Sequence, residues 1–127
     1  MLKITNVIIC DDARTETNGK FILVGVYAGD ILPSVFPAPL SLATWVQATP
    51  SKVGTQSLDL RISITDSPVK MEMSAKIEVE SLEHDFAFAT PQVNLLFEKP
   101  SEVVVEIKFD EGDWQEIARR RVLKQGN

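Results

Sequence analysis

The sequence predicts an all-β protein, an antiparallel β-sandwich of about eight strands that forms a single domain over residues 1–127. Three observations predict this fold. Apolar and polar residues alternate at period two along most of the chain, turn-forming residues separate the alternating stretches, and no stretch of useful length carries the helical period. The chain has no internal repeat, low-complexity tract or linker, so no second domain is expected.

The first two strands are expected at residues 3–11 and 20–27, joined by a polar arm that ends in Asn18-Gly19. Asn-Gly favours a type I′ turn because both central residues of that turn need positive φ, which Asn tolerates and Gly adopts freely. Both alternating faces of the second strand are apolar, which is typical of an interior strand covered on each side or of a strand at an interface. With Asn18 and Gly19 at the centre of the turn, the predicted register places Cys10 opposite Tyr27, Asp12 opposite Gly25 and Arg14 opposite Leu23.

The first set of candidate site residues comprises Asp11, Asp12, Arg14 and Gly25. A glycine opposite Asp12 leaves room for its carboxylate to turn toward Arg14 or toward a backbone amide. Two interpretations stay open: an ion pair that stabilises the end of the strand, and a carboxylate that faces a ligand. The structural ion pair is favoured, because ion-pair networks perturb carboxylates as active sites do.

The same region carries a resemblance to a known family, through three short motifs. These motifs are Cys10-Asp11-Asp12-Ala13-Arg14, Asn18-Gly19-Lys20 and Leu23-Val24-Gly25-Val26-Tyr27. Together they resemble the N-terminal signature of an uncharacterised bacterial family of small single-domain proteins. The resemblance implies a β-sandwich-like fold, and it passes on no catalytic residue because the family has no assigned activity.

Residues 28–39 are expected to form a loop, because Pro33, Pro37 and Pro39 lack the amide donor that a central strand or a long helix needs. The loop carries four large apolar side chains, and exposing all of them to water would be unfavourable. They are therefore expected to cover the open end of the sandwich, and they are also the best candidates for binding a partner. These four residues are Ile31, Leu32, Val35 and Phe36.

Six further strands are expected after this loop. In two of them the alternation is clean, with apolar residues facing the core and charged residues facing solvent. Residues 81–91 are expected to form a loop, although the alternation of Phe86 and Phe88 with alanines leaves a short strand open there. The six strands cover residues 40–48, 57–65, 69–80, 92–98, 102–109 and 114–123. The inward-facing residues of the clean pair are Leu58, Leu60, Ile62 and Ile64 on the first strand and Met71, Met73, Ala75, Ile77 and Val79 on the second.

The sequence offers few groups for catalysis. Cys10 is the only cysteine and His84 the only histidine, and no Gly-x-Ser-x-Gly elbow, phosphate-binding glycine loop or Cys/His metal cluster occurs. The chain is therefore expected not to be an enzyme and to carry no catalytic residue, no metal and no cofactor. Cys10 is expected to be a buried structural thiol. The acidic turn at 110–113 matches no EF-hand pattern, and a solvated turn is preferred there over a calcium site.

The formal net charge of −5 disfavours binding to nucleic acid or to an anionic membrane. The run Arg119–Arg121 is split between the two faces of a strand, and these arginines are expected to pair with acidic neighbours. A single cysteine, with neither a signal peptide nor an apolar stretch of about 20 residues, indicates the cytoplasm. We expect a protein-interaction module that binds a protein partner or a second copy of itself. The alternative is a small-ligand or calcium-binding sandwich.

Overall fold

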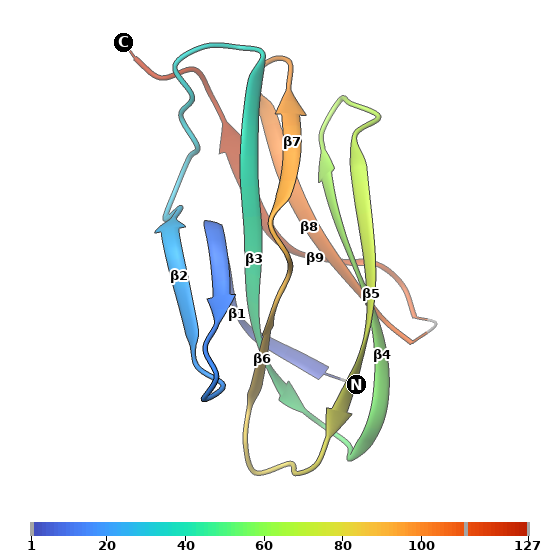
Figure 1. Cartoon of the computed structure of the whole chain (residues 1–127). Coiled ribbons are helices and arrows are strands. Elements are labelled where there is room, and N and C mark those ends of the chain that lie inside the picture. Colours follow the sequence, from blue (N-terminus) through green and yellow to red (C-terminus); the bar gives the residue numbers. More distant parts are fainter. Residues whose placement is uncertain (1, 111, 127) are drawn as a thin grey trace.

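The computed structural model describes residues 2–110 and 112–126, and no helix occurs within these ranges. Nine strands form two antiparallel sheets packed face to face, which confirms the predicted all-β sandwich (Figure 1). The strands are β1 (Leu2–Thr15), β2 (Phe21–Val26), β3 (Ala38–Pro50), β4 (Gly54–Ile64), β5 (Lys70–Val79), β6 (Phe86–Ala89), β7 (Val93–Phe97), β8 (Ser101–Phe109) and β9 (Gln115–Val122).

The first sheet has the strand order β2-β1-β3-β6, with β7 also paired to β3, and the second has the order β5-β4-β8-β9. β3 pairs with β7 through Ala38–Leu42 and with β6 through Trp45–Ala48, so β6 and β7 follow one another along the same side of β3 (Figure 1). The short strand β6 is the one that the alternation of Phe86 and Phe88 left open.

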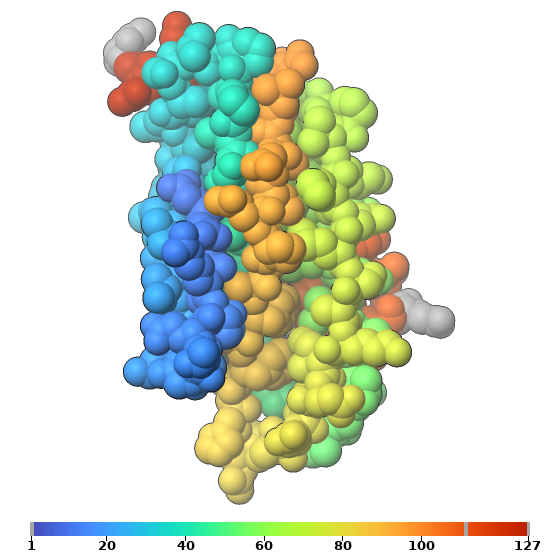
Figure 2. All heavy atoms as spheres, in the orientation of Figure 1, coloured from blue at the N-terminus to red at the C-terminus, as the bar shows by residue number. Residues whose placement is uncertain are grey.

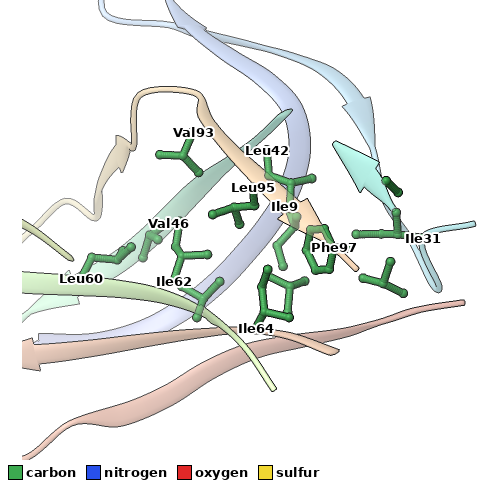
Figure 3. Packing of buried hydrophobic residues seen from close by; sticks show 14 residues of the cluster. Ile9, Ile31, Leu42, Val46, Leu60, Ile62, Ile64, Val93, Leu95 and Phe97 are labelled. Carbon is green, nitrogen blue, oxygen red and sulfur yellow. The ribbon is translucent and has the colours of Figure 1, made fainter. Parts of the chain in front are cut away.

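The core lies between the sheets and consists of the inward-facing apolar residues of both (Figure 3). Phe97, Ile62 and Leu60 are at most 1% exposed. Burying each such side chain stabilises the fold by about 1.5–3 kcal/mol relative to leaving it in water. All four residues predicted to face inward on β4 are buried, as period-two alternation requires. The labelled core residues in Figure 3 are Ile9, Ile31, Leu42, Val46, Leu60, Ile62, Ile64, Val93, Leu95 and Phe97.

β5 departs from this pattern. Of its predicted inward residues only Val79 is buried, whereas Met73 and Ile77 are half-buried and Met71 and Ala75 are exposed. β5 is the edge of its sheet, and the other sheet offers only the short strands β6 and β7 on this side. The inward-facing apolar residues of β5 are therefore covered only in part. In Figure 2 the atoms of β5 and β7 lie beside each other on the surface.

The turn between β1 and β2 is not the predicted type I′ turn. The Gly19 amide donates to the Glu16 carbonyl (3.0 Å), and the Glu16 amide donates to the Lys20 carbonyl (2.8 Å). Gly19, with φ 83°, is thus the left-handed residue of a three-residue loop. The Asn18 side chain accepts a hydrogen bond from the Lys20 amide (3.1 Å) and is not itself left-handed.

The longer loop shifts the register of this hairpin by one residue, so the predicted pairs are wrong. Cys10 lies opposite Val26 instead of Tyr27, Asp12 opposite Val24 instead of Gly25, and Arg14 opposite Ile22 instead of Leu23.

β2 is also not the interior strand that its two apolar faces suggest. It is the terminal strand of its sheet and pairs with β1 on one side only, within the described residues. The other interpretation of the same pattern, a strand at an interface, stays a prediction.

The loop between β2 and β3 covers the sandwich in part. Ile31 is 2% exposed, and its backbone amide donates to the Arg121 carbonyl of β9 (2.8 Å) while its carbonyl accepts from the Leu123 amide just after that strand (2.9 Å). Phe36 is half-buried against the core. Leu32 and Val35 are 51% and 62% exposed. The covering role is therefore confirmed for Ile31 and Phe36 and wrong for Leu32 and Val35.

β3 begins earlier than predicted, so Pro39 lies inside a strand. Residues Ala38–Leu42 of β3 pair with β7, whereas the pairing with β1 starts at Ala43. A proline is tolerated in this segment because β3 pairs here with a strand on one side only. No backbone amide is therefore needed as a hydrogen-bond donor on the other side.

Candidate functional site

The free edge of β2 is the most distinctive surface of the molecule. No residue from Phe21 to Val26 is charged. Ile22, Val24 and Val26 are 44%, 45% and 52% exposed, respectively. Figure 1 shows β2 at the outer side of its sheet with no strand beyond it. An edge strand with exposed apolar side chains and no charge is open to pairing with another chain.

The other edges of the two sheets are protected. β5 carries alternating charges at Lys70, Glu72, Lys76 and Glu78. β9 carries consecutive arginines. β6 and β7 lack charges, but they have only 4 and 5 residues and are interrupted by Pro91. Charges, short strands and proline are the usual devices that prevent edge pairing.

The backbone of β2 presents two unpaired residues to this edge. Glu16 and Lys20 form a hydrogen-bonded pair, and bonded and non-bonded pairs alternate along an antiparallel ladder. Ile22 and Val24 therefore direct their amides and carbonyls toward β1, and Phe21 and Leu23 direct theirs toward the free side.

Gly25 ends the regular part of the edge. Its φ of 68° lies in the left-handed region, and the Asp11 carboxylate occupies the space of a side chain, with Oδ2 only 2.1 Å from where a Cβ would stand. The Tyr27 hydroxyl donates to Asp11 Oδ1 (2.6 Å), and burial together with this bond raises the pKa of Tyr27 to about 12. The glycine thus makes room for Asp11 and not for Asp12, as the one-residue shift of register requires.

Asp12 and Arg14 form the ion pair expected from the sequence, with Arg14 Nε 3.0 Å from Asp12 Oδ2. They lie opposite Val24 and Ile22, so the four side chains share one face of the hairpin. The Arg14 side chain is 70% exposed, and exposed ion pairs contribute little stability. The pair forms a polar border beside the apolar residues of the edge.

Cys10 is fully buried, as expected, and its thiol donates to the Asp12 carbonyl (3.3 Å). Burial raises the pKa of this thiol, which opposes formation of the nucleophilic thiolate. His84 is exposed and lines a shallow hollow with Pro50, Asp85 and Phe86. Cys10 is not among the residues of that hollow.

No three His, Cys, Asp or Glu residues gather as a metal site in the part of the chain that is described. In the acidic turn at 110–113, Asp110 has φ 51° and its Oδ1 accepts a hydrogen bond from the Ser57 amide (3.2 Å). Glu111, which the calcium hypothesis also uses, lies outside the described residues.

The arginines of β9 pair with acidic neighbours, as predicted for this run: Arg119 with Glu102 and Glu116, and Arg121 with Asp30. The intervening arginine instead donates to the Tyr27 carbonyl at 3.3 Å.

Both tryptophans contact other side chains. Trp114 stacks under Arg61, whose guanidinium carbon lies 4.1 Å from the ring centroid. Trp45 meets Phe21 edge-on, with the ring centroids 6.1 Å apart. The second contact ties the start of β2 to β3.

Ile22 and Val24 were not singled out from the sequence. The signal that marks them is the absence of any charge between Phe21 and Val26, which a free edge makes unusual.

Comparison with known proteins places the chain in a family. A family model described as a family of unknown function (DUF6941) matches residues 6–119, so the chain belongs to this family. This confirms the expectation of a family without an assigned function, whereas its bacterial origin and its N-terminal signature stay predictions. No curated protein and no solved structure was found to match the chain. Among the described residues there is no helix of the length and apolarity needed to cross a membrane.

Proposed function

We propose that this member of a family of unknown function is a non-catalytic protein-interaction module of the cytoplasm, which binds an extended segment of a protein partner along β2. The observation that supports the proposal most strongly is the uncharged edge, with Ile22, Val24 and Val26 exposed on it. Strand addition to a sheet edge is a common mode of peptide recognition.

The partner segment would pair with the backbone of Phe21 and Leu23, whose amides and carbonyls face the free side. Each hydrogen bond contributes about 0.5–1.5 kcal/mol net. Covering the exposed parts of Ile22 and Val24 adds roughly 1 kcal/mol for each side chain. The Asp12–Arg14 ion pair beside them offers a carboxylate and a guanidinium with which charged groups of the partner can pair.

A binding role without catalysis agrees with the chemistry of the chain. Its one thiol is buried with a raised pKa, and its one histidine is exposed on a loop. The net charge of −5 favours a protein over nucleic acid or an anionic membrane as the partner.

The proposal is tested by capturing partners with three baits: the wild type, Val24→Arg and Leu96→Arg. Val24 and Leu96 are both 45% exposed, on the edge strands β2 and β7, so the two variants are matched in exposure. A captured protein is then purified and titrated against each bait by calorimetry. We expect Val24→Arg to weaken binding at least about tenfold, because it places a charge in the paired strand, and Leu96→Arg to bind as the wild type does.

Equal binding by the wild type and Val24→Arg would contradict the proposal. Loss of binding in Leu96→Arg alone would move the site to the edge formed by β6 and β7. Thermal unfolding of each variant checks that both remain folded, which is expected because neither side chain is in the core.

A further inference from the structure

We infer that the strand added to β2 is β2 of a second copy of this chain, antiparallel to the first about a two-fold axis at Ile22. The inference rests on the proposed function, since it fills the same edge, and it goes further by naming the partner and the register. A two-fold contact uses the same patch on both subunits, so the patch must complement itself.

The regular part of β2 has the symmetry that such a contact needs. It is bounded by the turn glycine Gly19 on one side and by the left-handed Gly25 on the other, which leaves the stretch Lys20–Val24. Ile22 is the middle residue of this stretch. Antiparallel pairing about Ile22 therefore uses the whole regular stretch of both copies, and any shift of register leaves part of it unpaired.

The backbone groups also match in this register. Phe21 of one copy lies opposite Leu23 of the other, and these are the residues whose amides and carbonyls face the free side. The two symmetric pairs exchange about four hydrogen bonds in total. The result is a continuous sheet that runs through both molecules and removes the free edge of each.

The side chains complement one another in the same way. Ile22 packs against Ile22 of the second copy, in a non-hydrogen-bonded pair where side chains approach most closely. On the opposite face Phe21 meets Leu23, an aromatic–aliphatic pair. Lys20 lies opposite Val24 of the second copy, whose own neighbour on that face is Asp12, so a cation on each copy approaches an anion on the other.

The contact is small compared with a standard interface of about 1,600 Å², so the dimer should be weak and dependent on concentration. Sedimentation equilibrium of the full chain from micromolar to millimolar concentration should show reversible dimerisation. Ile22→Arg should raise the dimer dissociation constant at least about tenfold, because it places two like charges opposite each other at the axis.

A cross-linking experiment tests the register itself. Cα atoms in a non-hydrogen-bonded antiparallel pair lie about 4.5 Å apart, within the range that a disulfide spans. Ile22→Cys should therefore give a disulfide-linked dimer under mild oxidation. Val24→Cys is a matched control of equal exposure and should cross-link far less, because its counterpart across the axis lies about four residues away along the strand. The native Cys10 is buried and should not contribute.

A strict monomer at every concentration, or cross-linking of Val24→Cys in preference to Ile22→Cys, would overturn the inference. A monomer that still binds a purified partner through β2, with binding lost in Val24→Arg, would leave the proposed function in place. A monomer that binds no partner along this strand would remove both.

Discussion

β2 and β9 are both edge strands, one in each sheet, and their free sides are treated in opposite ways. β9 places arginines beside acidic residues, with nitrogen–oxygen distances of 2.7–3.1 Å for its three ion pairs. A chain that paired with β9 would have to cover these charges, which costs free energy. β2 exposes Ile22 and Val24 instead and carries no charge from Phe21 to Val26.

The position of the two strands in the fold does not by itself explain why β9 is charged and β2 is apolar. Both strands lie at the outside of a sheet and pair with one other strand, although the end of β9 also bonds to Ile31 of the loop between β2 and β3. Protection of an edge such as β9 is the usual arrangement, and the absence of such protection on β2 is what supports the proposed interface.

The largest expected effect comes from Gly25, which ends the open edge. In Gly25→Ala the new methyl group would collide with the Asp11 carboxylate. The alanine would also have to adopt a φ of 68°, which is strained for any residue other than glycine. We expect the free energy of unfolding to fall by about 2–3 kcal/mol, measured by urea denaturation. Gly29→Ala is the control, because nothing lies within 4 Å of the added atom, and it should change stability by less than about 0.5 kcal/mol. Similar values for both variants would contradict the role given to Asp11.

The next effect concerns Tyr27, which holds Asp11 in place. Tyr27→Phe removes the donor to Asp11 Oδ1 and should lower the free energy of unfolding by about 1 kcal/mol near neutral pH. The pKa of Tyr27 is raised from 10 to about 12 in the folded chain. Its contribution is therefore complete below pH 10 and is lost as the pH rises from 10 to about 12. The wild type should lose more stability than the Phe variant over this window, and parallel pH profiles would contradict the assignment.

A smaller effect is expected when part of the charge that protects the edge of β9 is removed. The double variant Arg119→Val and Arg121→Val removes the ion pairs that β9 makes with Glu102, Glu116 and Asp30, and leaves Glu116 and Arg120 as the charged residues of the strand. We expect a new self-association, several-fold stronger than in the wild type by light scattering, because an edge strand with fewer charges pairs more readily. It should persist when Ile22→Arg is added. No increase in association would show that charge is not what protects β9.

The smallest effect is expected at the polar border of β2. Arg14→Ala breaks the ion pair with Asp12, but the arginine is 70% exposed. The free energy of unfolding should therefore change by no more than about 0.5 kcal/mol by thermal unfolding. A decrease in the free energy of unfolding of more than about 1 kcal/mol would mean that Arg14 stabilises the hairpin itself.

The fold could be predicted from the sequence because alternation at period two is a direct result of burying one face of a strand. Leu58, Leu60, Ile62 and Ile64 are all buried on β4 for this reason. The same rule fails for Met71 on β5, which is 38% exposed. Alternation identifies the inward face, and it does not report whether the opposite sheet extends far enough to cover it.

The candidate site was harder to predict, for two physical reasons. Asn18-Gly19 is compatible with a two-residue turn and with a three-residue loop that needs only Gly19 to be left-handed. The two-residue turn would place Asp12 opposite Gly25, whereas the three-residue loop places Asp11 against it. Apolar residues on both faces of β2 also do not distinguish an interior strand from an interface strand, because both exclude water once assembled.

Hydrogen exchange at individual amides of β2 reports directly on whether another chain pairs with this edge. The amides of Ile22 and Val24 already bond to β1, whereas those of Phe21 and Leu23 face the free side. We predict that raising the protein concentration, or adding a purified partner, slows exchange at Phe21 and Leu23. Unchanged exchange at these two amides under saturating conditions, or new protection confined to β7 or β9, would show that β2 is not the binding edge.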